Sequence, residues 1–177
     1  MKKIFVTRKL LKENEEKLKE LFDVKLNVED KVYSADQIIK ETKGFDGILS
    51  SVTDPINAVT ISKLSSTIKI IANGAVGFGN IDIKAAHERG ITVTNTPDVL
   101  TDATADIQIL LLLGASRKAY EGRLAAETQN WKWSWDFLLG KQMSNKRLGI
   151  LGMGRIGRAV AKRAKAFGME IHYHNRS

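Results

Sequence analysis

A glycine-rich turn between an apolar run and a helical pattern is the feature that most constrains what this 177-residue chain can form. Residues 146–151 have the character of a strand, and Gly152, Gly154 and Gly157 follow them with the spacing G-x-G-x-x-G. A helical pattern and a second strand pattern come next, so the whole unit fits within about thirty residues. Such glycines permit a tight turn, a close approach of the backbone to a pyrophosphate and close packing of the helix. The segment predicts a dinucleotide-binding βαβ unit, and an ordinary βαβ turn without a ligand is the alternative.

The helical pattern after this turn has one apolar face. Ile156, Val160, Ala164 and Phe167 recur at spacings of four, four and three, so they share one side of a helix. Gly168 lies where a left-handed residue commonly ends a helix. The helix N-terminus offers unpaired N–H groups and a partial positive charge to an anion. We expect a helix over 158–167 and a strand over 169–175.

Strand and helix patterns alternate through residues 1–98. Expected strands cover 3–7, 24–28, 47–50, 68–72 and 91–94, and expected helices cover 10–22, a segment opened by Ser34, a segment opened by Asp54-Pro55, and 83–88. Ser34 is the expected N-cap, because Gln37 follows it at the spacing of a capping box. Pro55 suits the first turn of a helix. The alternation predicts an α/β domain with a doubly wound parallel sheet.

Two loops of this domain are candidate ligand sites, because ligands of such sheets bind at the carboxyl ends of the strands. One loop covers 50–53. The other, residues 73–80, has three glycines within six residues, which expose successive backbone N–H groups of the kind that bind a carboxylate. A glycine-rich connection without a ligand is the alternative for the second loop.

A long helix is expected to follow the domain boundary at Pro97-Asp98. The pattern runs over 101–127, and its middle, 103–115, is apolar nearly all round. Such a helix is buried on most faces, here between domains or against a second subunit. Trp131, Trp133 and Trp135 then alternate along the chain. They could stack bases, although aromatic residues that fix a linker or fill a dimer interface are more usual.

Composition excludes several function classes. The chain has no cysteine, which rules out disulfides, thiolate nucleophiles and cysteine zinc sites, and we expect no metal site and a cytoplasmic location. Met1-Lys2-Lys3 precedes only three apolar residues, so we expect no signal peptide. The longest apolar run, 109–113, is too short to cross a bilayer. Apolar and charged fractions of 43% and 27% are those of a globular protein.

The net charge of +8 lies at the C-terminal end. Residues 141–177 hold nine Lys or Arg residues and one acid, Glu170, whereas the two signs balance in the first 140 residues. A basic patch can indicate nucleic-acid binding. However, no aromatic residues interleave with the basic ones on the 155–167 helix. A solvated helix face or a phosphate-bearing cofactor explains the charge better, and we expect no nucleic-acid partner.

Taken together, these segments resemble the D-isomer-specific 2-hydroxyacid dehydrogenase family and, within it, the glyoxylate and hydroxypyruvate reductases. The likeness runs nearly unbroken over 68–175. It is carried by NGAVGFGNIDIKAAHERGITVTNTPDVLTDATAD and by WKWSWDFLLGKQMSNKRLGILGMGRIGRAVAKRAKAFGM. The resemblance implies hydride transfer between a nicotinamide and a small 2-oxo or 2-hydroxy acid. It also implies a homodimer built largely on the helix after Thr101.

The resemblance implies a fold and a set of site residues. Residues 1–98 would be a flavodoxin-like substrate domain, and 99–177 would be a long interdomain helix and the start of a Rossmann domain. The expected substrate site comprises Val52 and Thr53, which border the pocket, and the backbone of Val76 and Gly77, which holds the carboxylate. The expected cofactor site comprises Thr104 near the nicotinamide, and Gly152, Gly154, Arg155, Ile156 and Gly157 at the pyrophosphate.

The end of the second strand predicts the choice of cofactor. NAD selection needs a carboxylate there to accept hydrogen bonds from the ribose hydroxyls. This chain has Asn175, Arg176 and Ser177 instead, and a cation with a hydroxyl suits a 2′-phosphate. We therefore expect NADP(H) to be preferred over NAD(H), and the alternative is that Arg176 merely ends a strand.

No catalytic residue is assigned within the chain. The arginine, glutamate and histidine that the resemblance implies lie beyond Ser177, and His87, His172 and His174 are not credible general acids. We expect a truncated reductase whose nucleotide-binding domain is incomplete, and which is inactive alone. The alternative is a non-catalytic dimerising module that binds a nucleotide or a protein.

Overall fold

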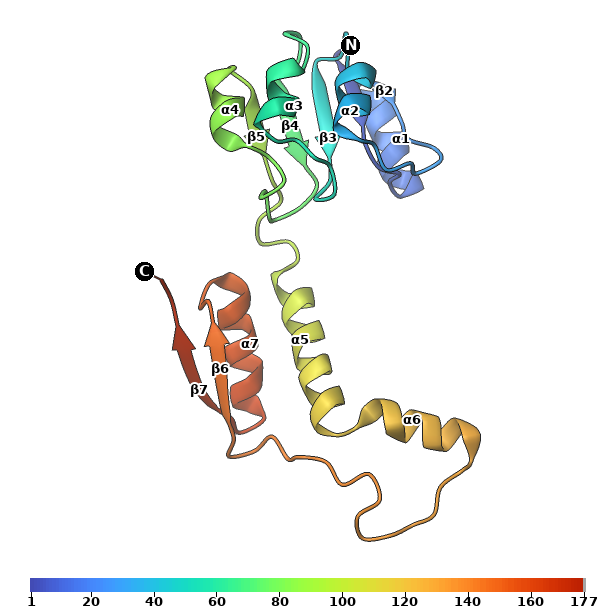
Figure 1. Cartoon of the computed structure of the whole chain (residues 1–177), viewed down its shortest axis with the longest axis vertical. Coiled ribbons are helices and arrows are strands. Elements are labelled where there is room, and N and C mark those ends of the chain that lie inside the picture. The colour runs from blue at the N-terminus through green and yellow to red at the C-terminus, as the bar shows by residue number, and fades with distance from the viewer. Residues whose placement is uncertain (177) are drawn as a thin grey trace. The chain divides into compact units, whose positions relative to one another are not determined.

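The computed structural model describes residues 1–176 and divides into two compact units. The first unit covers Met1–Pro97, and the second begins at Asp98. Figure 1 shows the elements of both units along the chain.

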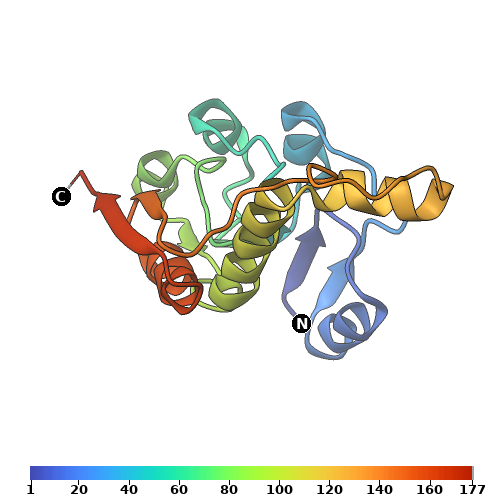
Figure 2. The ribbon, with the colours of Figure 1, turned by 90° about the horizontal axis from the view of Figure 1, so that it is seen from below.

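The first unit is a parallel five-stranded sheet with helices on both faces. Its strands lie in the order β2-β1-β3-β4-β5 and all pair in parallel. Helices α2, α3 and α4 cover one face, whereas α1 lies on the other (Figure 2). The strands are β1 (Lys3–Val6), β2 (Asp23–Lys25), β3 (Gly47–Ser50), β4 (Ile70–Asn73) and β5 (Thr92–Thr94), and the helices are α1 (Lys12–Leu21), α2 (Ala35–Glu41), α3 (Ala58–Lys63) and α4 (Ile83–Glu88). The predicted doubly wound parallel sheet is confirmed.

The core of this unit lies between the central strands and α2 to α4. Phe5, Ile48 and Ile71 point from β1, β3 and β4 into one apolar cluster, where Ile38 and Ile61 meet them from α2 and α3. All five side chains are at most 1% exposed. Each such burial contributes about 1.5–3 kcal/mol relative to exposure, and this packing holds the strand ends that carry the two candidate loops.

Local capping explains one correct helix start and one wrong one. Ser34 and Gln37 form the predicted capping box at the start of α2. The helix expected at Asp54-Pro55 begins instead at Ala58, with Asn57 as its N-cap. Asp54 cannot cap that helix, because its carboxylate turns inward and accepts the backbone N–H of Ser51 at 2.7 Å.

The second unit packs one helix between a strand pair and another helix. Its elements are α5 (Thr101–Ser116), α6 (Ala119–Thr128), β6 (Arg147–Leu151), α7 (Arg155–Ala166) and β7 (Glu170–His174), of which β6 and β7 pair in parallel. Ala105 and Ile109 of α5 meet Val160 and Ala164 of α7 in one apolar cluster. The predicted βαβ order is confirmed. Gly168 follows the C-cap residue of α7 and has a φ of +72°, as expected for a left-handed residue at the end of a helix.

The prediction of one continuous helix over 101–127 is wrong. The chain breaks between α5 and α6, where Lys118 adopts a left-handed φ of 53°. Lys141 donates its N–H to the carbonyl of Ser116 at 2.7 Å. Gly140 lies so close to Ser116 that a Cβ there would be 2.5 Å from the Ser116 carbonyl oxygen. The returning segment therefore takes up the last carbonyl of α5 that a continuing helix would use.

The outer side of α5 is less buried in the single chain than its composition predicts. Ala105 and Ile109 are buried, but Ile107, Leu110 and Leu111 are 55%, 62% and 66% exposed. Phe167, expected on the apolar face of α7, is also 40% exposed, and it lies just after the last helical residue. Within residues 1–176, no helix is both long and apolar enough to span a bilayer.

Candidate functional site

The loop after β4 presents free backbone N–H groups while its carbonyl groups are taken. Asn73 is 2% exposed, and its Nδ2 donates to the Gly77 carbonyl at 2.8 Å. Asn95 Nδ2 donates to the Val76 carbonyl at 2.8 Å, and the N–H of Thr96 donates to the Ala75 carbonyl at 2.9 Å. Within residues 1–176, the N–H groups of Val76 and Gly77 donate no hydrogen bond. The loop is therefore fixed as a pair of donors suited to an anion such as a carboxylate.

The neighbouring loop after β3 is joined to this one at its base. Ser50 Oγ donates to Asn73 Oδ1 at 3.2 Å, and the N–H of Gly74 donates to the Ser50 carbonyl at 2.8 Å. Val52 is 57% exposed at the tip of its loop. Thr53 Oγ1 lies 2.9 Å from Ser51 Oγ. The fold thus brings together the four residues that the sequence predicts for the substrate site at one edge of the sheet.

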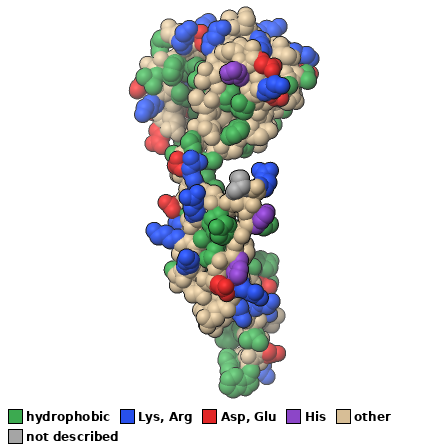
Figure 3. Space-filling model, turned by 90° about the vertical axis from the view of Figure 1, so that its left-hand side faces the viewer, with side chains coloured by type: hydrophobic (Ala, Val, Ile, Leu, Met, Phe, Trp, Pro, Cys, Tyr) green, Lys and Arg blue, Asp and Glu red, His purple; other side chains and the backbone are tan. Residues whose placement is uncertain are grey.

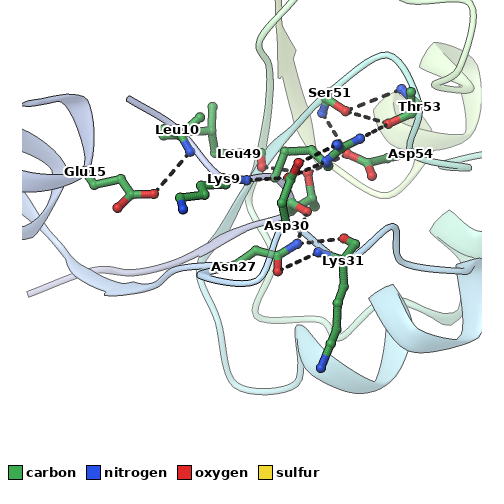
Figure 4. A network of polar contacts seen from close by, with 12 residues as sticks. Lys9, Leu10, Glu15, Asn27, Asp30, Lys31, Leu49, Ser51, Thr53 and Asp54 are labelled. Carbon is green, nitrogen blue, oxygen red and sulfur yellow. Dashed lines mark hydrogen bonds and ion pairs between the residues drawn. The ribbon is translucent and has the colours of Figure 1, made fainter. Parts of the chain in front are cut away.

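Arg8 follows β1 and anchors the β3 loop through Thr53. Figure 4 labels its partners Asp30 and Thr53 within one polar network. Arg8 Nη1 donates to Thr53 Oγ1 at 3.2 Å, and its Nε and Nη2 donate to Asp30 at 2.8 and 2.9 Å. This bidentate pair fixes the plane of the guanidinium group. The hydrogen bond and charge of Asp30 raise the pKa of Arg8 despite some desolvation, and the Asp54 charge acts in the same direction. The hydrogen bond from Arg8, followed by the Lys9 N–H, holds the pKa of Asp30 well below its usual range.

The glycine turn of the second unit has the geometry of a phosphate-binding loop. Gly152 adopts a φ of +99°, which a side chain would strain. A Cβ at Gly157 would lie 2.2 Å from the Gly152 carbonyl oxygen, so only glycine allows α7 to pack this close. At Gly154 a Cβ would meet nothing within 4 Å. Among residues 1–176, the N–H groups of Gly154, Arg155 and Ile156 at the start of α7 donate no hydrogen bond. The turn therefore fits a pyrophosphate, which these N–H groups would hold.

A cavity of about 640 Å³ adjoins this turn at the end of β7. Asn175 Oδ1 accepts the N–H of Met153 at 2.6 Å, and Arg158 Nε donates to the Met153 carbonyl at 3.2 Å. The predicted residues Asn175 and Arg176 both line the cavity. Ser177, predicted to belong to the same site, lies outside the described residues.

A known protein family matches most of the chain, including both of these turns. The family model described as "D-isomer specific 2-hydroxyacid dehydrogenase, catalytic domain" matches residues 4–167. The chain belongs to the D-isomer specific 2-hydroxyacid dehydrogenase family. The resemblance expected from its sequence is thereby confirmed.

Individual members of this 2-hydroxyacid dehydrogenase family cover nearly all of the chain. The glyoxylate reductase of Korarchaeum cryptofilum is 42% identical over 98% of the chain and 52% of its own length. The glyoxylate reductase of Thermococcus kodakarensis is 39% identical over 99% of the chain and 54% of its own length. The solved structure of the TT0316 protein from Thermus thermophilus is 40% identical, with a TM-score of 0.89 over 99% of the chain and 56% of that protein. The chain spans about half the length of the curated relatives it matches.

The remaining predicted site residues lie in the second unit. Thr104 is half-buried near the start of α5. Arg155 opens α7, where its Nε lies 2.7 Å from Asp98 Oδ1, and Ile156 is half-buried beside it. Residues 1–176 contain no cluster of three acids or histidines that could hold a metal.

Sequence reasoning missed three residues that shape the sites. Arg8 and Asn73 position the two loops of the first unit, and Arg158 contacts the glycine turn. Arg8 and Asn73 follow strands, and a polar residue at the carboxyl end of a parallel strand could have indicated them. Arg158 carried no such signal, because a cation in the first turn of a helix is usually a solvated side chain.

Proposed function

We propose that the chain forms the substrate-carboxylate and cofactor sites of an NAD(P)-dependent reductase that converts small 2-oxo acids to D-2-hydroxy acids. The free N–H groups of Val76 and Gly77 are the observation that carries this proposal. Glyoxylate and hydroxypyruvate are the proposed substrates, and the two glyoxylate reductases at 42% and 39% identity support that choice. Residues 1–98 would be the substrate domain, and 99–177 would begin the NAD(P)-binding Rossmann domain.

The proposed roles follow from the chemistry of each turn. The N–H groups of Val76 and Gly77 would donate to the substrate carboxylate, and Val52 and Thr53 would border its other end. The N–H groups at Gly154, Arg155 and Ile156 would hold the pyrophosphate. A bound nicotinamide would supply the hydride.

NADP(H) is the proposed cofactor in preference to NAD(H). Asn175 stands where an NAD-selective site has a carboxylate, and its neutral amide holds the glycine turn by accepting the Met153 N–H. Arg176 adds a cation beside it. A ribose that carries a 2′-phosphate suits this environment better than one with a free hydroxyl.

The proton donor for ketone reduction is not found among the described residues. His87 is exposed on α4, and His172 and His174 are exposed on β7. His172 Nε2 lies 2.8 Å from Glu170 Oε1, and both side chains are more than half exposed. The two β7 histidines belong to the second unit, whereas the proposed carboxylate-binding loop follows β4 in the first unit. We therefore propose that the 177-residue chain binds ligands but does not turn them over.

A chimera tests this proposal. The chain alone and the chain followed by the remaining part of the Korarchaeum cryptofilum reductase would be assayed for glyoxylate-dependent NADPH oxidation. We expect turnover only from the chimera. Gly77→Pro removes one N–H donor and should raise KM for glyoxylate about tenfold or more while the NADPH Kd stays unchanged. Gly77→Ala is the matched control, because it keeps the N–H and a Cβ there meets nothing within 4 Å.

Two results would contradict the proposal. Turnover by the chain alone would show that its own residues complete the chemistry. A folded chimera that binds no nicotinamide dinucleotide would overturn the proposed cofactor site.

A non-catalytic dimerising module is the second candidate. The exposed apolar face of α5 favours it, together with exposed tryptophans at 131, 133 and 135. On either proposal the chain forms a homodimer through the helix after Thr101. NADPH binding without turnover in a well-folded chimera would favour the second candidate. The cytoplasmic location stays a prediction.

A further inference from the structure

Helix α7 carries three arginines, and two of them are neutralised by acids of the same unit. Arg155 Nε lies 2.7 Å from Asp98 Oδ1, and Arg163 Nε lies 2.6 Å from Asp106 Oδ1. Among residues 1–176, no carboxylate pairs with Arg158. Lys and Arg side chains are prominent on the surface of this unit (Figure 3), so an unpaired guanidinium adds to a positive field that attracts an anion.

Arg158 is nevertheless held in place. Its Nε donates to the Met153 carbonyl at 3.2 Å, which ties the side chain to the glycine turn. The two Nη groups donate no hydrogen bond within the described residues. A guanidinium fixed through Nε presents its remaining donors as a planar fork, the geometry that matches two oxygens of a phosphate.

The cavity beside Arg158 offers donors and no carboxylate. Its lining consists of Leu151, Gly152, Met153, Gly154, Arg158, His174, Asn175 and Arg176. Asn175 Oδ1 accepts the Met153 N–H at 2.6 Å, and its neutral amide adds no negative charge to the cavity. Two arginines, Arg158 from α7 and Arg176 after β7, therefore face a space without an opposing acid.

We infer that Arg158 is a specificity-determining residue that binds the 2′-phosphate of an NADP-type cofactor, opposite Arg176. The inference rests on the proposed nucleotide site and deepens it, since it assigns the phosphate to a residue of the helix as well as to the end of β7. The pyrophosphate is left to the backbone N–H groups of the turn. Arg155, held by Asp98, takes no part in recognising the 2′-phosphate.

Binding measurements on the full 177-residue chain test this inference without catalysis. Calorimetry would compare NADPH with NADH, and 2′,5′-ADP with 5′-AMP, for the chain and for Arg158→Gln. Loss of a charge-assisted bidentate contact should raise the Kd of NADPH and of 2′,5′-ADP about tenfold or more. The Kd of NADH and of 5′-AMP should change by less than about threefold, because neither carries the 2′-phosphate.

Two further variants separate a specific contact from a general loss of charge. Lys162→Gln removes the same charge one turn further along α7, outside the cavity, and should leave the NADPH-to-NADH ratio unchanged. Arg158→Lys keeps the charge but loses the planar pair of donors, so its affinity for NADPH should lie between that of the unsubstituted chain and that of Arg158→Gln. Circular dichroism would confirm that each variant is folded.

Failure of this inference differs from failure of the proposed function. If the unsubstituted chain binds neither NADPH nor NADH, the proposed nucleotide site itself is wrong. Suppose instead that the chain binds NADPH. If Arg158→Gln then raises the Kd values of NADPH and NADH by the same factor, or changes neither, the assignment of the 2′-phosphate to Arg158 is overturned. Equal effects of Arg158→Gln and Lys162→Gln would also overturn it.

Discussion

Thr7 and Asp54 join the ends of β1 and β3, where Thr7 Oγ1 donates a 2.5 Å hydrogen bond to Asp54 Oδ2. Both residues are fully buried. The N–H of Ser51 donates to the same oxygen at 2.7 Å, whereas Asp54 Oδ1 has no hydrogen-bond partner among the described residues. The carboxylate therefore fixes the turn that presents Val52 to the proposed substrate site.

Asp54→Ala should loosen the first unit at this turn. The substitution leaves the Ser51 N–H without an acceptor, and an unsatisfied group of this kind costs about 1–3 kcal/mol. It also removes the short hydrogen bond of the buried Thr7 hydroxyl, which keeps only the longer contact to the Leu49 carbonyl at 3.2 Å. We expect the local free energy of opening over residues 47–57 to fall by about 2 kcal/mol or more. Amide hydrogen exchange is the suitable measurement, because all three tryptophans lie in the second unit and their fluorescence would not report on the first.

Two control substitutions accompany this prediction. Asp54→Asn keeps an oxygen that can accept both hydrogen bonds, so its effect should be smaller than that of Asp54→Ala. Glu20→Ala removes an exposed acid of α1 and should leave exchange over 47–57 unchanged. Unaltered exchange in Asp54→Ala would show that the buried carboxylate does not hold the turn.

The Arg8–Asp30 pair predicts a loss of stability in acid. The pKa of Asp30 in the folded chain is lowered, chiefly by the hydrogen bond from Arg8. The group therefore contributes stability above its unfolded pKa of about 3.9, and that contribution is lost as the pH falls toward the folded pKa. Asp30→Asn should flatten the dependence of stability on pH below about pH 4. Urea unfolding of the first unit, followed by circular dichroism between pH 2 and pH 7, measures this slope.

Other carboxyl groups of the first unit also contribute to the dependence of stability on pH. The carboxyl groups with lowered pKa values that will keep part of the slope are Glu29, Glu41 and Asp46. Asp36→Asn serves as the matched control, because Asp36 makes no ion pair among the described residues. If the stability of Asp30→Asn depends on pH as steeply as that of Asp36→Asn, the Arg8–Asp30 pair does not stabilise the first unit in the way proposed.

Periodicity predicted the order of the elements because each apolar strand and helix face must be buried in this architecture. The capping box at Ser34 and the left-handed cap at Gly168 depend on local chemistry, and both were predictable. The sequence predicts a helix start at Asp54, but the hydrogen-bond partners of its carboxylate are Thr7, 47 positions away in sequence, and the Ser51 backbone. Contacts at that separation leave no local pattern.

The same limit applies to the candidate sites and to the helix break. The glycine spacing identified the turn at 152–157, because the turn itself requires those residues. The break after Ser116 depends on Gly140 and Lys141, which return from another part of the chain. The sequence alone could not single out Arg158, because the difference lies in the tertiary contacts. Acids pair with Arg155 and Arg163, whereas no acid among the described residues pairs with Arg158.

Gly157→Ala should disrupt the glycine turn. Its Cβ would lie 2.2 Å from the Gly152 carbonyl oxygen, a backbone atom that cannot move aside without shifting the turn. Overpacking of this kind costs about 1–3 kcal/mol, and the shifted N–H groups should weaken NADPH binding about tenfold or more. Gly149→Ala is the control, since a Cβ at this β6 position meets nothing within 4 Å. Calorimetry with NADPH would detect the difference, and equal affinities of the two variants would contradict it.

A charge on the outer face of α5 should separate the proposed homodimer. Leu110 and Leu111 are 62% and 66% exposed in the single chain, and an apolar face of this size on a long helix is usually covered by a partner. Burying a carboxylate there without a partner is costly, so Leu110→Glu should weaken self-association about a hundredfold or more. Gln108→Glu adds the same charge at a position that is already polar and should leave association nearly unchanged. Sedimentation equilibrium over a range of concentrations measures both, and a chain that is monomeric before substitution would refute the dimer itself.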